Sequence, residues 1–193
     1  MASGGIPKKI FSFWAGQSYP QFEASCFAAI RRLHPVEQGW NVTVLNVDQP
    51  GLEPPPTPLD GSVLTVQQLA DWYRLAAIAT DGGVWYDASV IMLQHSTPFW
   101  VNMHDNTLQG WSTPQSQSVP GQETLESWAF AAPAQFPFVV RWRDNFRRAL
   151  TQGCVSYVNS VPIEVIAPEQ TRPFHCHPCL GTYHHPFFGP ATT

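Results

Sequence analysis

Residues 67–93 decide the fold of this protein and read QQLADWYRLAAIATDGGVWYDASVIML. Just before them, Thr65 and Gln68 have the spacing of a capping box, so we expect a helix to begin there. Apolar residues lie on nearly every side of this helix, which is typical of a buried helix. Gly82 and Gly83 then end it, because glycine accepts left-handed backbone geometry. The stretch therefore predicts a buried helix followed at once by an apolar strand.

Two charged residues lie within the predicted buried helix. Asp71 and Arg74 are three positions apart, so they share one face of the helix. A charge in a protein interior is costly unless it is paired or contacts a ligand. The two residues are therefore either a structural ion pair or part of a binding site.

A carboxylate ends the apolar strand that follows the two glycines. Because side chains alternate along a strand, we expect Trp85, Asp87 and Ser89 on one side and Tyr86 on the other. In α/β folds, ligands bind beyond the carboxyl ends of the strands. Asp87 is thus a candidate site residue, and the alternative is that it only caps the end of the strand.

This segment resembles a known family of sugar transferases. ADWYR at 70–74 and DGGVWYDAS at 81–89 are similar to the pattern S-D-x-x-R, helix, G-G-x-[WY]-x-D of capsular-polysaccharide and mannosyl-type sugar transferases. The pattern is also similar to the core of the glucosylating bacterial toxins, which share the nucleotide-diphospho-sugar transferase (GT-A) fold. IPKKIFSFWAG at 6–16 and ESWAFAA at 126–132 resemble the family's opening strand and a downstream strand.

The resemblance implies an α/β protein of the GT-A fold, with a mostly parallel central sheet flanked by helices, in a single domain over residues 1–193. It also implies a glycosyltransferase that moves a hexose from a nucleoside-diphosphate sugar to a glycan acceptor in surface-polysaccharide or glycoprotein synthesis. We expect the donor to be a UDP-sugar. The alternative within this resemblance is a non-catalytic nucleotide-sugar-binding module.

The resemblance implies substrate-binding roles for five residues: Trp14, Asp71, Arg74, Asp87 and Ser89. Trp14, near the first strand, would contact the nucleotide base. Asp71 and Arg74 would bind hydroxyls of the donor sugar. Asp87 would contact the ribose, the sugar or a metal ion, and we expect it to be the indispensable carboxylate of the site.

The expected metal site departs from the family pattern. The family's D-x-D motif becomes Asp87-Ala88-Ser89 here, so the second carboxylate is missing, and Ala70 replaces the serine before the helix aspartate. The resemblance implies Mn2+ or Mg2+, held by Asp87, Ser89 and His184 near the end of the chain. Because a serine hydroxyl is a poorer ligand than a carboxylate for a hard cation, we expect only weak to moderate metal dependence.

An inverting transfer requires a base that takes the proton of the acceptor hydroxyl. Glu126 and Glu123 lie at the third family-like block and are the candidates for this catalytic role. The alternative is that both are solvated loop acids.

The C-terminal tail contains a possible zinc motif. Cys176 and Cys179 have C-x-x-C spacing, and His184 and His185 follow closely. Four-ligand zinc sites normally have ligand pairs that lie further apart in the sequence. A zinc-stapled interaction domain is therefore a second alternative, beside an ordinary proline-punctuated loop.

Composition limits the partners and the location that we expect. A length of 193 residues with 44% hydrophobic residues is enough for one core. The net charge is −4 with only ten Lys and Arg, which makes nucleic acid an unsuitable partner. No apolar run of about eighteen residues predicts a transmembrane segment, and residues 1–5 lack a signal-peptide core, so we expect a cytoplasmic protein. Four cysteines at unequal spacings predict free thiols.

The remaining chain predicts strands that alternate with helices, which favours α/β layering. Residues 48–61 contain five prolines and predict a partly extended loop, and the polar residues 102–120 predict an irregular connection. The other expected elements are strands at 9–13, 40–47 and 128–132 and helices at 21–33 and 137–150.

Overall fold

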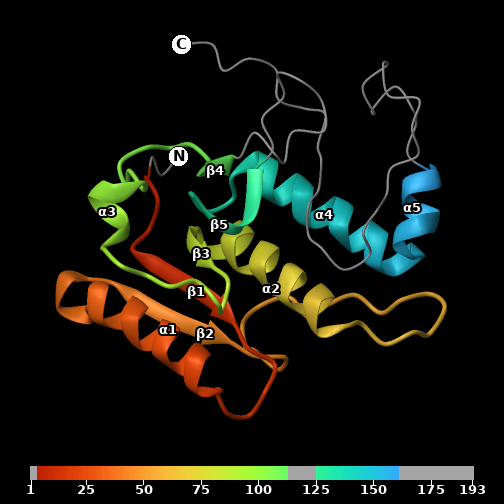
Figure 1. Ribbon diagram of the computed structural model, residues 1–193. Helices are drawn as coiled ribbons and strands as arrows, with labels where there is room; N and C mark the ends of the chain where they lie inside the picture. Colours follow the sequence, from red (N-terminus) through yellow and green to blue (C-terminus); the bar gives the residue numbers. More distant parts are fainter. Residues whose placement is uncertain (1–3, 113–124, 161–193) are drawn as a thin grey trace.

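A five-stranded sheet with helices on both faces forms the centre of the computed structural model, which describes residues 4–112 and 125–160 (Figure 1). The strands are β1 (Lys9–Phe13), β2 (Asn41–Leu45), β3 (Gly83–Tyr86), β4 (Gln109–Ser112) and β5 (Leu125–Ala132). The helices are α1 (Gln21–Leu33), the 3-10 helix η1 (Val36–Gln38), α2 (Val66–Asp81), α3 (Ser96–Phe99), α4 (Pro137–Gln152) and α5 (Cys154–Ser160). In the described residues, no helix is both long and apolar enough to cross a bilayer.

The sheet is mixed, with the strand order β2-β1-β3-β5-β4. β1 pairs in parallel with both β2 and β3, whereas β5 is antiparallel to both β3 and β4. Four strands therefore point the same way and β5 alone opposes them. The expected α/β class with a mostly parallel sheet and flanking helices is confirmed at this level.

Several sequence-based boundaries differ from the structure. The strand expected at 40–47 is Asn41–Leu45, and the helix expected at 137–150 extends to Gln152. The connection expected over 102–120 contains a four-residue strand, β4, which pairs with β5 at the edge of the sheet, with a register shift between Gly110 and Ser112. The strand expected at 128–132 begins earlier, at Leu125. In both β4 and β5 the strand is stabilised by cross-strand hydrogen bonds, and the polar sequence gives no hydrophobic alternation that would have indicated it.

The helix α2 begins with the capping box that the sequence predicts. The Thr65 hydroxyl accepts a hydrogen bond from the backbone N–H of Gln68, and the Gln68 side chain accepts one from the backbone N–H of Thr65. At its other end, Gly82 and Gly83 have φ of 65° and 121°. A Cβ atom on Gly82 would lie 2.3 Å from the backbone nitrogen of Ala134, and one on Gly83 would lie 2.5 Å from the carbonyl oxygen of Lys9. The two glycines are therefore required both by backbone geometry and by close packing.

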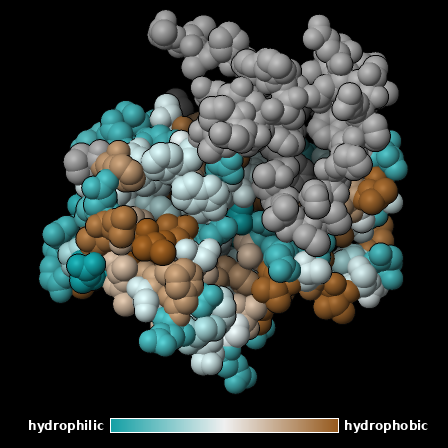
Figure 2. Space-filling view, in the orientation of Figure 1, coloured by the Kyte–Doolittle hydropathy of each residue, from teal (hydrophilic) through white to brown (hydrophobic). Residues whose placement is uncertain are grey.

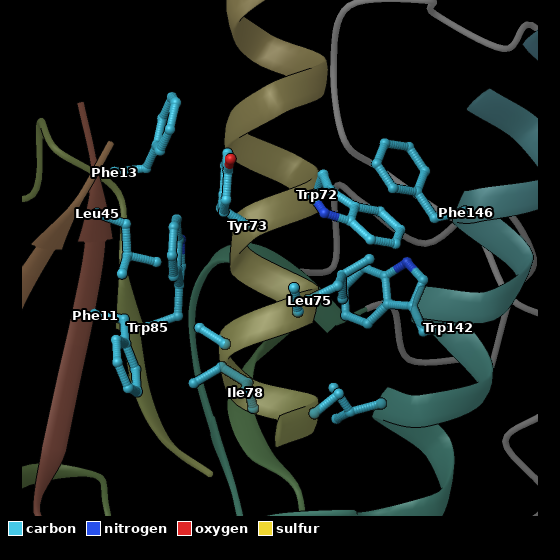
Figure 3. Close-up of a cluster of buried hydrophobic side chains, with 14 of the residues drawn as sticks. Phe11, Phe13, Leu45, Trp72, Tyr73, Leu75, Ile78, Trp85, Trp142 and Phe146 are labelled. Atoms are coloured by element: carbon cyan, nitrogen blue, oxygen red, sulfur yellow. The ribbon is translucent and has the colours of Figure 1, made fainter. Parts of the chain in front are cut away.

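The sheet separates two hydrophobic clusters. One cluster contains α2, α4 and the side chains that the sheet directs toward them. Figure 3 shows Phe11, Leu45 and Trp85 on the sheet side of α2, and Trp142 and Phe146 reaching it from α4. The other cluster contains Phe27 and Ile30 of α1 with Val84 and Tyr86 of β3. The alternation predicted for Trp85 and Tyr86 is thus confirmed, since the two side chains belong to opposite faces.

On the outer surface, large hydrophobic side chains that remain exposed belong to several separate segments, among them Leu59, Val63 and Leu93. Figure 2 shows the same pattern on one face, where hydrophobic residues are interspersed with hydrophilic ones. Isolated exposed hydrophobic residues are normal for a folded domain.

A buried polar network connects the end of α1 to β3 and α3. Nδ1 of His34 lies 3.0 Å from the Ile30 carbonyl oxygen, and Nε2 lies 3.1 Å from the backbone N–H of Ser96. Because a backbone N–H only donates, Nε2 must be the acceptor, and the ring is neutral with its proton on Nδ1. The Ser96 hydroxyl also contacts Nε2 and the Tyr86 hydroxyl, which accepts a hydrogen bond from the indole of Trp100. Burial lowers the pKa of His34 from 6.5 to about 4.

This network predicts a loss of stability in mild acid. The folded protein holds His34 neutral, whereas the unfolded chain takes up a proton near pH 6.5, so stability is complete above this pH and falls as the pH approaches about 4. The expected loss of unfolding free energy is at most about 3 kcal/mol, since one pKa unit corresponds to about 1.4 kcal/mol. Urea titrations across this range should show that His34→Gln lowers stability at neutral pH and removes this part of the pH dependence.

The exposed His104 provides the control for this experiment. His104→Gln should leave both the stability and its pH dependence close to those of the wild type. An unchanged pH dependence in His34→Gln would show that another group causes the acid sensitivity.

Candidate functional site

Arg74 of α2 lies at the centre of a charged cluster at the end of β3. Its Nη2 atom lies 2.7 Å from Oδ1 of Asp71 and 3.3 Å from Oδ1 of Asp87. The arginine side chain is only 6% exposed, whereas Asp71 is 18% and Asp87 36% exposed. Arg74 thus joins the helix to the end of the strand, and Asp87 is the most accessible of the three.

Trp85 orients the Asp87 carboxylate from the same side of β3. Its indole N–H donates to Oδ1 of Asp87 over 2.7 Å, and its ring lies 5.5 Å from the guanidinium carbon of Arg74. The sequence predicts that Trp85 lies on the same side as Asp87, but it does not indicate a role for the indole in the site. The signal was present in the spacing, because residues two apart on a strand share a face.

The backbone of Asp87 is fixed as well as its side chain. Its N–H donates to the carbonyl oxygen of Trp128 on β5, and its own carbonyl oxygen accepts from the N–H of Val90, which closes a turn. Within the described part of the chain, all hydrogen bonds and ion pairs of the carboxylate use Oδ1. No described residue bonds the other oxygen, Oδ2, so among these residues it can accept hydrogen bonds from a ligand.

The cluster carries a net negative charge, with two carboxylates around one guanidinium. Burial raises the pKa of Asp71, the Arg74 guanidinium opposes this rise, and the nearby Asp87 adds to it. Among the described residues, the Nε atom of Arg74 is buried without a hydrogen-bond partner. Four other buried side-chain atoms of the described residues also lack a partner, namely Ser12 Oγ, His95 Nε2, Trp142 Nε1 and Arg147 Nε.

Ser89 lies in the turn after β3 and is exposed to solvent. Strand alternation would carry Ser89 to the same side as Asp87, as the sequence predicts, but β3 ends at Tyr86. The turn from Asp87 to Val90 ends the alternation, because its carbonyl-to-amide hydrogen bond redirects the chain.

Trp14 and Glu126 come to the same edge of the sheet as Asp87 through its topology. Trp14 follows β1, which is parallel to β3, and Glu126 lies at the start of β5, which is antiparallel to β3. The carboxyl ends of parallel strands lie at the same edge of a sheet as the amino end of a neighbouring antiparallel strand. The Trp14 indole donates to the carbonyl oxygen of Ser18, and its ring packs edge-on against Tyr19.

The metal site expected at Asp87, Ser89 and His184 is only partly within the described residues. His184 lies outside them, as do Glu123 and the tail residues Cys176, Cys179 and His185. In residues 4–112 and 125–160, no three or more His, Cys, Asp or Glu side chains form a group that could hold a metal ion. The two aspartates of the cluster are both paired with Arg74.

Comparison with known proteins finds no family model that matches the chain and no significant match among curated proteins.

The burial of Arg74 predicts a large effect of its removal on stability. Arg74→Ala should lower the free energy of unfolding by roughly 3–5 kcal/mol, because it leaves the largely buried Asp71 without its counter-charge. Asp71→Asn in the Arg74→Ala background should recover part of this loss. Urea unfolding of the three proteins measures both effects.

Lys9 and Asp81 provide a matched control. Their ion pair has the same length of 2.7 Å, but its side chains are 39% and 37% exposed. Lys9→Ala should therefore cost no more than about 1 kcal/mol. An Arg74→Ala variant that is as stable as Lys9→Ala would contradict the structural role of the cluster.

Proposed function

We propose that this protein is a glycosyltransferase of the GT-A type, which moves a hexose from a nucleoside-diphosphate sugar, a UDP-sugar, to a glycan acceptor. The observation that carries the proposal is the Asp87 carboxylate, which Trp85 and Arg74 hold at the end of β3 through one oxygen, while the other has no partner among the described residues. In α/β folds, ligands bind at this end of the strands. The resemblance of residues 70–89 to the sugar-transferase pattern supports the same reading.

The exposed fractions suggest how the charged residues divide the work of donor binding. Asp87 is the most accessible and would accept hydrogen bonds from ribose or sugar hydroxyls through Oδ2. Asp71 and Arg74 are more deeply buried, so their contact with donor hydroxyls would involve only their few accessible atoms. Their larger contribution would be to hold Asp87 in place, since preorganised groups bind a reacting ligand without rearrangement.

A divalent cation fits the described residues only in part. Asp87 supplies one uncommitted carboxylate oxygen and Ser89 one hydroxyl, which is fewer than the six or more oxygens that a hard cation takes. If Mn2+ or Mg2+ is bound, Asp87, Ser89 and His184 would hold it together with water and the donor diphosphate. The ion would supply positive charge for the departing diphosphate.

Glu126 is the proposed base for the acceptor hydroxyl. It lies at the start of β5, two residues before Trp128, whose carbonyl oxygen binds the Asp87 backbone. A carboxylate at this position lies at the edge of the sheet where Asp87 lies, so it could take the proton of an acceptor hydroxyl bound there.

The missing second carboxylate at Ser89 favours one alternative, a module that binds a nucleotide sugar without transferring it. Both functions predict that nucleotide sugars raise the melting temperature, because a ligand of the native state stabilises it by mass action. Only the transferase consumes the donor. A thermal-shift panel of nucleotide sugars with and without Mn2+, followed by a turnover assay, distinguishes the two.

Replacing Asp87 tests the proposed function directly. Asp87→Asn should lower transfer by about 100-fold or more, a loss of roughly 2.7 kcal/mol of transition-state stabilisation, because the amide lacks the charge. Its melting temperature should change little, since Arg74 keeps Asp71 as a partner. Asp81→Asn, in an exposed ion pair on the same segment, should keep wild-type turnover. Full activity in Asp87→Asn would refute the assignment.

Ser89→Asp tests the metal proposal. The variant should bind Mn2+ more tightly than the wild type, because a carboxylate suits a hard cation better than a hydroxyl. Calorimetric titration measures the affinity, and Ser156→Asp at an exposed position of α5 is the control for an added charge. Equal or weaker Mn2+ binding in Ser89→Asp would place any metal elsewhere.

A further inference from the structure

Three aromatic side chains beside β4 and β5 form a surface that the proposed donor site does not use. We call Phe99, Trp111 and Trp128 the aromatic platform. The rings of Trp111 and Trp128 stack with an interplanar angle of 17° and a centroid distance of 6.1 Å, and Phe99 lies 5.7 Å from Trp111. Phe99 is 52% and Trp128 38% exposed. Large aromatic rings normally bury most of their surface in a core, so two half-exposed rings in one contiguous set point to a ligand.

The platform rests on rigid structure. The ring centroid of Trp100 lies 6.2 Å from that of Trp111 and 5.9 Å from that of Tyr86. The Trp100 indole N–H also donates a hydrogen bond to the Tyr86 hydroxyl. Tyr86 belongs to the buried network with Ser96 and His34. Rings that are already fixed lose little conformational entropy when a ligand binds.

The platform adjoins the Asp87 site through the backbone. The carbonyl oxygen of Trp128 accepts the hydrogen bond from the N–H of Asp87 over 2.9 Å. Glu126 lies two residues from Trp128 on the same strand. A molecule that lies on the Trp128 ring is therefore close to both proposed catalytic carboxylates.

We propose that the aromatic platform is a carbohydrate-binding subsite, on which pyranose rings of an oligosaccharide stack against Trp111 and Trp128. A pyranose has an apolar C–H face and a rim of hydroxyl groups, so it covers a ring face while its hydroxyls stay in water. The polarised C–H bonds are attracted to the negative face of the indole. That this oligosaccharide is the acceptor rests on the proposed transferase function, whereas its binding to the platform does not.

The chemistry of the platform disfavours other occupants. Its three side chains carry no charge, and the whole protein has a net charge of −4, whereas anionic membranes and single-stranded nucleic acids require basic groups beside the aromatic ones. A second protein copy requires about 800 Å² on each partner. Three aromatic side chains of at most roughly 250 Å² each, only partly exposed, provide much less.

The test titrates the protein with neutral tetrasaccharides of glucose, mannose and N-acetylglucosamine, and follows tryptophan fluorescence. At least one should bind in the millimolar range or tighter, and Trp128→Ala should weaken that binding at least tenfold, with Trp128→Phe in between. Phe22→Ala removes an exposed aromatic ring on α1 and should bind as the wild type does. Melting temperatures show that each variant is folded, and Trp128→Phe keeps an aromatic ring if the alanine variant does not fold.

The subsite is overturned if the wild type binds none of the tetrasaccharides. It is also overturned if the wild type, Trp128→Phe and Trp128→Ala bind them equally. A wild-type dimer that Trp128→Ala dissociates in sedimentation also overturns it. Failure of the proposed transferase is separate: if no nucleotide sugar is bound or consumed, Trp128-dependent tetrasaccharide binding still supports the subsite. If the wild type consumes the donor, Trp128→Ala should still transfer the sugar to water but should no longer transfer it to the tetrasaccharide. Unchanged transfer to the tetrasaccharide would overturn the subsite and leave the proposed transferase function standing.

Discussion

A buried guanidinium must remain paired, and the structure around Arg74 follows from this constraint. Its side chain is 6% exposed and has one partner on its own helix, Asp71, and one in the turn after β3, Asp87. The ring of Trp85 lies beside the guanidinium and donates to the second partner. Removing the guanidinium would leave two carboxylates without a counter-charge, and one of them, Asp71, is largely buried. The cluster therefore fixes the position of α2 relative to the end of β3.

This arrangement depends on the short connection between α2 and β3. Gly82 and Gly83 have positive φ and lie too close to neighbouring backbone atoms for any side chain. They let the chain reverse within two residues, so that Asp87 returns to Arg74 only thirteen positions later. The ion cluster and the glycines are thus a single structural unit. The same unit brings Asp87 to the edge where Trp128 and the aromatic platform begin.

The parts of the fold that could be predicted from the sequence are those with local causes. The capping box at Thr65, the burial of α2 and the alternation of Trp85 and Tyr86 each depend on residues a few positions apart. The strand β4 and the reversed direction of β5 depend on pairing across the sheet, which no local pattern encodes. The contact between His34 and Ser96 joins residues 62 positions apart. In the site, the pairing of Asp71 with Arg74 and the nearness of Trp85 to Asp87 follow from spacing, whereas the contact of Arg74 with Asp87 joins a helix to the end of a strand and has no local signal.

The charge of the cluster limits how a nucleotide sugar would bind in the proposed function. Two carboxylates face one guanidinium, and the more exposed of them is Asp87, so a diphosphate in direct contact would meet like charge. Hydroxyl groups of the ribose or sugar suit this carboxylate, because they donate hydrogen bonds to it. The diphosphate would then lie further from Asp87. Either a cation would lie between the two negative groups, or other positive groups of the chain would bind the diphosphate. Under the proposed function, the ionised Asp87 orients the sugar, and the charge of the leaving group is neutralised by a different group.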